Sequence, residues 1–352
     1  MSHICVAMSG GVDSAGAALL MQQAGHQVSG VTLFLHTCRE TPVSPEQSAE
    51  AVSARAVAET IGIPHTTLDR RDLFQEKVMG HFISEYVDGR TPNPCVDCNR
   101  EIKFGALMDW ALAHGADYLA TGHYSKVAYD EESGRWLLLR GNDRSKDQSY
   151  VLYQLTQHQL SHLILPVGTY EKPVLRQLAE QAGLPNAHRH DSQDICFIPD
   201  GDYVNFLKQR GVEPVPGDFV DEQGKVLGRH KGLECYTIGQ RKGLGVSADQ
   251  PLYVLRKDGA SNTIVLGPNE RLFTRTLTAD RVNWISIPAL TAPIRVTAKT
   301  RYSQKEAAAT VEPLPEGRIR VTFDEPQRAI TAGQAVVLYD GEKVVGGGTI
   351  LG

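Results

Sequence analysis

The chain opens on the apolar run Ile4-Cys5-Val6-Ala7-Met8 and continues directly into Ser9-Gly10-Gly11-Val12-Asp13-Ser14. The apolar run has the length of a buried strand, and residues 15–23 are rich in helix formers, which predicts a strand-to-helix turn at the two glycines. Glycine lets the backbone approach a ligand closely, and the unpaired N–H groups at a helix start favour a phosphate. The stretch therefore predicts an α/β fold with an anion site at its first turn.

Two other interpretations of this stretch must be compared with the phosphate site. A Gly-Gly pair before Asp and Ser can be an ordinary tight turn with a helix cap, but its place after the first strand favours a ligand site. The Walker A loop is excluded, because no Gly-Lys-Ser or Gly-Lys-Thr closes the stretch. What remains resembles the SGGxDS loop of the N-type ATP pyrophosphatases, which cleave ATP between its α and β phosphates and leave AMP on the substrate.

Length and composition set the class of protein. A chain of 352 residues suggests two or three domains, and 22% charged with 41% hydrophobic residues is typical of a soluble globular protein. No apolar run approaches the ~18 residues of a membrane span, and no secretory signal is evident, so we expect a cytoplasmic protein without a membrane partner.

Charge is distributed unevenly along the chain. The net charge of −5 argues against a general nucleic-acid binder, yet two stretches are locally basic. Basic stretches are either solvated faces or contacts to a phosphate backbone. The first basic stretch has a single acidic residue, Glu234, and its basic residues are Lys225, Arg229, Lys231, Arg241 and Lys242. The second stretch contains Arg295, Lys299, Arg301 and Lys305.

The order of predicted elements indicates a doubly wound parallel sheet over residues 1–202, because strands and helices alternate there. Glycine becomes frequent after about residue 202, which favours a small mixed β domain over 203–276, with a strand and basic turn at 236–245. Short alternating stretches then predict a C-terminal β-barrel or sandwich over 277–352. In the first domain we expect strands at 28–35, 65–68 and 118–121, helices at 45–61, 73–87, 102–113 and 173–182, and a hairpin of 126–129 with 136–140.

Three of the six cysteines stand in polar, loop-like surroundings. Cys95 and Cys98 have the spacing of a redox pair, a zinc half-site or half of an iron-sulfur site, and no second CxxC supports a four-cysteine zinc site. Cys98 is predicted just ahead of a helix, close to Arg100 and Lys103, and such surroundings lower a thiol pKa. Cys196 follows His188, Arg189 and His190. The alternative is two unrelated buried cysteines, since Ile195 and Phe197 flank Cys196.

Seven motifs together resemble the tRNA-specific 2-thiouridylases, in order and over nearly the full length. They are SGGVDS (9–14), TPNPCxxCNxxIKF (91–104), ATGHY (120–124), KDQSY (146–150), DSQDICF (191–197), YTIGQRKGLG (236–245) and TRY (300–302). This family converts the wobble uridine of certain tRNAs to 2-thiouridine, using ATP and persulfide sulfur. The resemblance implies an adenine nucleotide hydrolase-like first domain, ATP with Mg²⁺, a tRNA substrate, and a persulfide donor or relay protein.

The resemblance also implies residue roles. Cys196 would carry the persulfide and Cys98 would attack it, leaving a transient Cys98–Cys196 disulfide. Asn93, Pro94 and Cys95 would lie beside the flipped target base. ATP would be bound by Ala7, Met8, Ser9, Gly10, Gly11, Val12, Asp13, Ser14, Leu33 and Gly122. The tRNA would be contacted by His123, Lys146, Asp147, Gln148, Arg301, Tyr302 and Gln334.

One departure from the family pattern opens a second mechanism. Many members carry aspartate where this chain has Cys95, which leaves its role unassigned. Cys95, Cys98 and Cys196 have the ligand type and number for an incomplete iron-sulfur cluster, so a cluster-dependent thiolation is an alternative. Apart from the Mg²⁺ that accompanies ATP, we expect no other metal. Another ATP pyrophosphatase would share only the opening loop, and a non-enzymatic tRNA-binding protein would need neither the loop nor the thiols.

Overall fold

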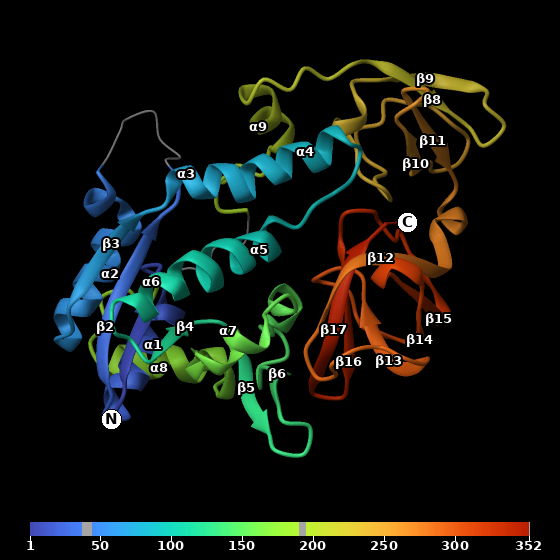
Figure 1. Cartoon of the computed structure of the whole chain (residues 1–352). Helices are drawn as coiled ribbons and strands as arrows, with labels where there is room; N and C mark the ends of the chain where they lie inside the picture. Colours follow the sequence, from blue (N-terminus) through green and yellow to red (C-terminus); the bar gives the residue numbers. More distant parts are fainter. Residues whose placement is uncertain (37–43, 190–194, 352) are drawn as a thin grey trace.

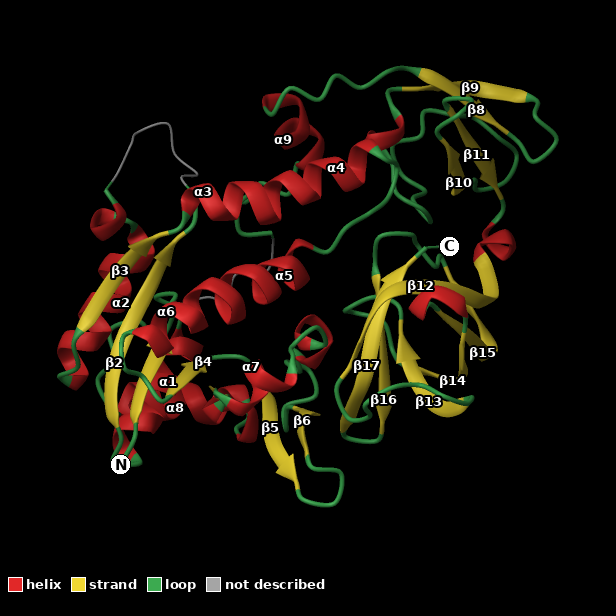
Figure 2. Ribbon diagram, in the orientation of Figure 1, coloured by secondary structure: helices red, strands yellow, loops and turns green. Residues whose placement is uncertain are grey.

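The computed structural model describes residues 1–36, 44–189 and 195–351 (Figure 1). An N-terminal α/β unit carries the predicted phosphate loop, a small β unit follows, and a C-terminal barrel packs beside the first unit (Figure 2). The predicted order of fold types is confirmed.

The N-terminal sheet is parallel throughout, in the order β3-β2-β1-β4-β7. Neighbours on both sides of β1 come later in the chain, so the connections diverge at its carboxyl end, where doubly wound sheets bind ligands. The predicted phosphate loop begins at that end. The strands are β1 (His3–Ala7), β2 (Gln27–Phe34), β3 (His65–Asp69), β4 (Tyr118–Thr121) and β7 (Leu163–Ile164).

Both faces of this sheet are covered, which explains the continuous apolar run in β1. Ile4 and Val6 face one core, with α1 (Val12–Gln23), α2 (Ala49–Ile61) and α8 (Lys172–Gln181). Cys5 faces the opposite core, which includes side chains of α6 (Leu107–Ala113). Alternation of side chains along a strand buries each residue on one face or the other.

The helix that carries Cys95 and Cys98 starts earlier than predicted. It consists of α5 (Pro94–Asp97), a π-helical stretch (Cys98–Ala106) and α6, whereas the sequence placed the two cysteines in a loop before residue 102. The prediction was wrong because Pro94 opens the helix at its first position, where its missing N–H is harmless, and Asn93 caps it. A second helix is built alike, from α3 (Arg71–Phe74), a π-helical stretch (Gln75–Gly80) and α4 (His81–Val87).

Two further local predictions differ from the structure. Ser44 caps only a 3₁₀ turn, Pro45–Gln47, and α2 begins after a second cap, Ser48, whose hydroxyl accepts the Ala51 N–H at 3.2 Å. Residues 236–245 form turns rather than a strand. Glycines 239, 243 and 245 there adopt positive φ angles, which interrupt the regular extended backbone of a strand.

The predicted hairpin joins the C-terminal barrel instead of standing alone. It pairs β5 (Ser125–Asp130) with β6 (Arg135–Arg140), and β6 continues the barrel sheet through the pair Leu139–Lys343. The barrel closes by pairing of its first and last strands. Its strands are β12 (Phe273–Trp284), β13 (Ile294–Lys299), β14 (Ala307–Pro313), β15 (Ile319–Arg328), β16 (Ala335–Asp340) and β17 (Lys343–Ile350).

The middle unit has its own core, formed by side chains such as Phe219, Val254 and Leu266. It follows α9 (Tyr203–Gln209) and contains β8 (Gly217–Val220), β9 (Val226–His230), β10 (Tyr253–Asp258) and β11 (Thr263–Gly267). The proposed boundary at 276/277 lies within β12. The remaining helix is α7 (Gln157–Ser161), and none of the helices in the described ranges is long and apolar enough to cross a membrane.

Candidate active site

The stretch from Ala7 to Ser14 runs from the end of β1 through a turn into the first residues of α1. Gly10 has a φ of +74°, which favours glycine, and Gly11 is the residue before the helix. The Ser14 hydroxyl donates to the Gly11 carbonyl at 2.9 Å and accepts the Ser9 N–H at 3.1 Å. Met8 is anchored to β2, because its N–H donates to the Val31 carbonyl at 2.7 Å. These bonds fix the conformation of the turn at the carboxyl end of β1.

Asp13 is fixed by two residues that the sequence analysis missed. The Lys172 ammonium donates to both Asp13 carboxylate oxygens, at 2.6 and 2.7 Å, and the Tyr124 hydroxyl donates to Oδ1 at 2.9 Å. Lys172 is only 6% exposed. Tyr124 ends the ATGHY motif, which was a signal for it, whereas no spacing in the sequence pointed to Lys172.

Gly122 supports the loop from behind. A Cβ atom at this position would lie 2.6 Å from both the Asp13 carbonyl carbon and the Ser14 nitrogen. Only glycine permits this approach, so the structure brings Gly122 to the loop as the ATP prediction requires. Leu33, on β2, packs against the apolar cluster that contains Cys98 and against the core that contains Cys5.

Cys98 is buried, contrary to the predicted reactive surroundings. The side chain is 8% exposed, and burial raises its pKa to about 11 although the Lys103 charge acts in the opposite direction. The predicted lowering of this pKa was wrong for the protein without substrates, because Cys98 lies inside the helix and not ahead of it. Cys95 is exposed and lies one turn earlier, after the Asn93 cap. Partial enclosure raises the pKa of Cys95 as well.

The segment that follows Cys196 packs against the cysteine helix. Phe197 and Ile198 share an apolar cluster with Cys98 and Phe82, while the Cys196 side chain is exposed. The two cysteine segments, far apart in sequence, are therefore adjacent in the fold. Of the DSQDICF motif, residues 191–194 lie outside the described residues, as does His190.

His123 links the phosphate loop to the cysteine helix. It follows Gly122, and its Nε2 lies 3.5 Å from the Lys103 ammonium, while its Nδ1 lies 2.7 Å from the Thr121 hydroxyl. Burial, followed by the Lys103 charge, lowers the pKa of His123 well below its usual range, so the ring is neutral. Lys103 was missed as a site residue although it lies within the quoted TPNPCxxCNxxIKF motif.

The residues expected to contact tRNA fall into two groups. Asp147 is buried, with its carboxylate accepting the Gly141 and Ser149 N–H groups, and Gln148 accepts the Tyr124 N–H at 2.9 Å. Lys146 lies in the same turn. This first group thus lies beside the hairpin of β5 and β6, next to Tyr124 and Gly141.

The second group lies on the barrel. Tyr302 is 43% exposed, and Arg301 donates to the Thr331 hydroxyl at 2.8 Å and to the Ile238 carbonyl of the middle unit at 3.3 Å. Gln334 donates to the carbonyls of Thr91 and Pro92, at 2.8 and 3.2 Å. The barrel therefore holds the loop that leads to the expected target-base residues.

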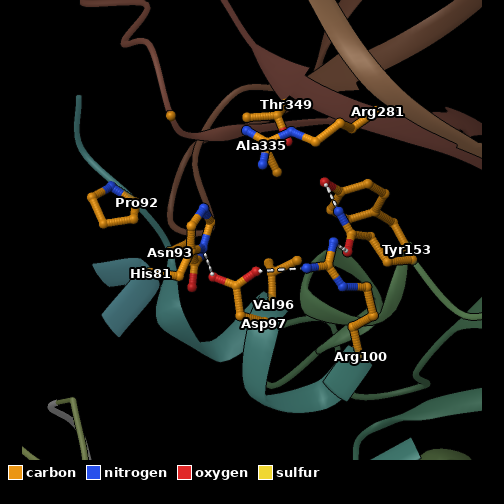
Figure 3. A pocket seen from close by; sticks show the side chains of 12 residues that line it. His81, Pro92, Asn93, Val96, Asp97, Arg100, Tyr153, Arg281, Ala335 and Thr349 are labelled. Carbon is orange, nitrogen blue, oxygen red and sulfur yellow. Dashed lines mark hydrogen bonds and ion pairs between the residues drawn. The ribbon is translucent and has the colours of Figure 1, made fainter. Parts of the chain in front are cut away.

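A pocket separates the cysteine helix from the barrel (Figure 3). His81, Asn93, Asp97 and Arg100 approach it from the α/β unit, and Arg281 approaches it from β12. Asp97 is buried, accepting from His81 at 2.8 Å and from Arg100 at 3.4 Å. Asn93 therefore lies at the boundary between the α/β unit and the barrel.

The three candidate cluster ligands do not form a metal site in this structure. Within the described ranges, no three His, Cys, Asp or Glu side chains are arranged to hold a metal ion, and Cys95, Cys98 and Cys196 all lie in those ranges. We derive no step through an iron-sulfur cluster.

Comparison with known proteins agrees with this geometry. Residues 2–200 match the family model described as tRNA methyl transferase HUP domain, 204–268 its PRC-barrel domain, and 274–350 the aminomethyltransferase beta-barrel domain. A tRNA-specific 2-thiouridylase MnmA of Moorella thermoacetica is 52% identical over 98% of both chains. That of Clostridioides difficile is 49% identical over 99% of this chain and 97% of its own.

A solved 4-thiouridine synthetase in complex with RNA and ATP superposes with a TM-score of 0.36 at 17% identity, over 59% of this chain and 50% of that one. The family assignment rests on the near full-length matches at about half identity, together with the described loop and cysteine helix. The chain belongs to the tRNA-specific 2-thiouridylase family.

Proposed function

We propose that the protein uses ATP to replace the oxygen at carbon 2 of the wobble uridine of tRNA by sulfur. One observation supports this most directly. The neighbouring residues Gly122 and His123 contact the phosphate loop on one side and Lys103 of the cysteine helix on the other. This contact supports an activation site and a sulfur-transfer site that would lie next to each other, as a two-step reaction on one base requires.

Activation would take place at the loop. The uracil oxygen attacks the α phosphorus of ATP, pyrophosphate leaves, and the base carries AMP as a good leaving group. The N–H groups of the loop and the start of α1 bind the phosphates. The target uridine would lie beside Asn93, Pro94 and Cys95, extruded from its stack.

Mg²⁺ would be held beside the phosphates by Asp13. A carboxylate offers about four acceptor positions, of which Lys172 occupies two and Tyr124 one, so one remains on Oδ2. Mg²⁺ in phosphate sites commonly takes one or two protein carboxylates. The ion would supply neutralisation of phosphate charge.

Sulfur transfer would follow on the same base. A donor or relay protein loads Cys196 as a persulfide, whose terminal sulfur attacks carbon 2 and displaces AMP. The Cys98 thiolate then attacks the Cys196 sulfur and breaks the sulfur–sulfur bond, which leaves the outer sulfur on the base. The Cys98–Cys196 disulfide formed must take two electrons from an external thiol before the next turnover.

Contacts to the rest of the tRNA would come from two surfaces. One surface would comprise His123, Lys146, Asp147 and Gln148, and the other, on the barrel, Arg301, Tyr302 and Gln334. The domain division at 202/203 and 276/277, the persulfide donor and a cytoplasmic location belong to the same proposal.

The proposal is tested by mass analysis of tRNA nucleosides after incubation with ATP and a persulfide source. We expect 2-thiouridine from the wild type and none from Cys98→Ser or Cys196→Ser, while tRNA-dependent pyrophosphate release persists in both variants. Cys235→Ser, in the middle unit, is the matched control and should thiolate normally.

Retained thiolation in either active-site variant would contradict the sulfur-transfer roles. Absence of any tRNA-dependent pyrophosphate release from the wild type would contradict the activation step and leave a tRNA-binding protein.

A further inference from the structure

The Gly10 carbonyl in the phosphate loop is approached by more hydrogen-bond donors than it has lone pairs to accept them. It accepts from the Ser53 hydroxyl at 2.9 Å, from the Asn186 side-chain amide at 2.9 Å and from the Arg189 guanidinium at 3.2 Å. A carbonyl oxygen has two lone pairs. The longest of the three bonds, that of Arg189, is therefore the surplus one.

The Arg189 guanidinium lies against the backbone of the loop at Gly10. A Cβ atom built on Gly10 would lie 3.1 Å from Arg189 Nη1, which places a guanidinium nitrogen directly at the loop backbone. The residue is exposed, and none of the carboxylates in the described ranges pairs with it. Among the described residues, no acidic side chain neutralises its charge.

Hydrogen bonds fix the backbone around Arg189, whereas its guanidinium makes only the 3.2 Å bond to the Gly10 carbonyl among those found in the described residues. Arg176 on α8 donates to the carbonyls of Ala187 and Arg189, each at 3.2 Å. Asn186 is 6% exposed, and its side-chain oxygen has no hydrogen-bond partner among the residues that the structure describes. An anchored backbone with an unsatisfied polar neighbour is suited to a ligand that has not yet bound.

The charge of the loop makes a cation necessary there. A triphosphate brings several negative charges, the loop contains no lysine, and the Lys172 ammonium is bound to Asp13. Arginine presents a planar fork of donors that matches phosphate oxygens, and such charge-assisted bonds are stronger than one to a neutral carbonyl.

We propose that Arg189 is a further ATP-binding residue, whose guanidinium leaves the Gly10 carbonyl and binds the triphosphate. The inference rests on the proposed function, because it takes ATP as the ligand of the loop. Arg189 stands seven residues before Cys196. The nucleotide would therefore be bound from the same segment that carries the sulfur-bearing cysteine.

The test measures the dissociation constants of ATP and of adenosine for the full-length protein by calorimetry, without tRNA. For Arg189→Gln we expect ATP to bind roughly ten- to a hundredfold more weakly, the size of one charged hydrogen-bond pair, while adenosine binding is unchanged. Arg189→Lys should recover part of the loss. His188→Gln is the matched control one residue away, at an exposed side chain, and should bind both ligands as the wild type does.

An unchanged ATP dissociation constant in Arg189→Gln would overturn the proposal, as would an equal loss for adenosine and ATP. The melting temperature of each variant, compared with that of the wild type, identifies any variant that fails to fold, and Arg189→Lys then serves in place of Arg189→Gln. The wild type serves as the separate check on function. If it binds ATP but does not thiolate tRNA, the proposed function fails while the role of Arg189 stands.

Discussion

At the scale of single residues, the phosphate loop depends on side chains that enter from distant parts of the chain. Asp13 belongs to the loop, but Lys172 and Tyr124, which fix its carboxylate, come from α8 and from the residues after β4. Close packing of α1 against α8 brings Asp13 and Lys172 together. Leu175 on α8 packs directly against Gly16 on α1, where a Cβ atom would lie only 2.7 Å from a Leu175 methyl carbon. Gly16 follows Asp13 by three residues, and Leu175 follows Lys172 by three.

We expect Lys172→Met to lower the free energy of unfolding by about 2 kcal/mol, the size of a charged hydrogen bond lost from a largely buried group. Of the two side chains that bind the Asp13 carboxylate, Tyr124 alone would remain. Because the carboxylate would then be held less firmly, tRNA-dependent pyrophosphate release should also fall. Chemical denaturation and a pyrophosphate assay measure both effects. Lys225→Met, at an exposed lysine, is the control, and equal stability of the two variants would contradict the role of the ion pair.

Residue chemistry was predictable where a motif carried it, and unpredictable where burial decided it. Neighbouring cations suggested a lowered pKa for Cys98, yet the fold buries the thiol and raises that pKa to about 11. Desolvation depends on what packs around a group, which charge spacing in the sequence does not contain. Lys172 illustrates the same limit, since its partner lies 159 residues away.

At the scale of elements, α4 and the cysteine helix are joined by a small charged network. His81 on α4 lies between Asp97 on α5, at 2.8 Å, and Glu85 on its own helix, at 3.5 Å. Arg90 in turn binds Glu85, and Arg100 binds Asp97. The hydrogen bond to Asp97, followed by that to Glu85, raises the pKa of His81 to about 9.

This network predicts a pH-dependent stability. The folded pKa of His81 lies above its usual 6.5, so the fold favours the protonated ring. Its contribution, about 2 kcal/mol after allowance for partial exposure, is complete below about pH 6.5 and is lost as the pH rises through about 9. Wild type should therefore exceed His81→Gln in unfolding free energy at pH 6 but not at pH 10.

Urea denaturation across this range, with His158→Gln as an exposed control, provides the measurement. A difference between wild type and His81→Gln that stays constant from pH 6 to pH 10 would show that the charge on His81 does not stabilise the fold.

Elements were predictable by type more often than by boundary. The strand and helix of the first turn follow from hydrophobic runs, and their places are confirmed. The start of the cysteine helix was missed by eight residues, because Thr91-Pro92-Asn93-Pro94 is typical of a loop until Asn93 is recognised as a cap. The π-helical geometry of residues 98–106 has no signature in the sequence.

At the scale of the whole molecule, the α/β unit and the barrel share one core. Leu138 and Tyr150 of the first unit pack with Val337 and Tyr339 of the barrel. Tyr150 donates to the Ala335 carbonyl at 2.8 Å, and Asn283 donates to the Tyr153 carbonyl at 2.7 Å. The middle unit has a separate core. The hairpin and the barrel were each predicted correctly from the sequence. The pairing of β6 with β17 was not predicted, because it joins residues more than 200 positions apart in the chain.

We expect Leu138→Ala to destabilise both large units together, by about 3 kcal/mol, because it removes a fully buried side chain from their common core. Hydrogen exchange followed by mass spectrometry should show faster exchange in both α6 and β16. The matched control, Leu266→Ala in the middle unit, should change exchange mainly within residues 217–267. Exchange that increases only in the α/β unit of Leu138→Ala would contradict a shared core.

The bond from Gln334 to the loop at Thr91 and Pro92 bears on how such a protein could be rearranged, in evolution or by engineering. A chimera that received the barrel of another protein would lose or misplace the amide that holds the approach to Asn93, even if the new barrel bound RNA well. The barrel is thus not an interchangeable module. Exchange of the barrel would have to include the strand start near residue 334 together with the 91–93 loop.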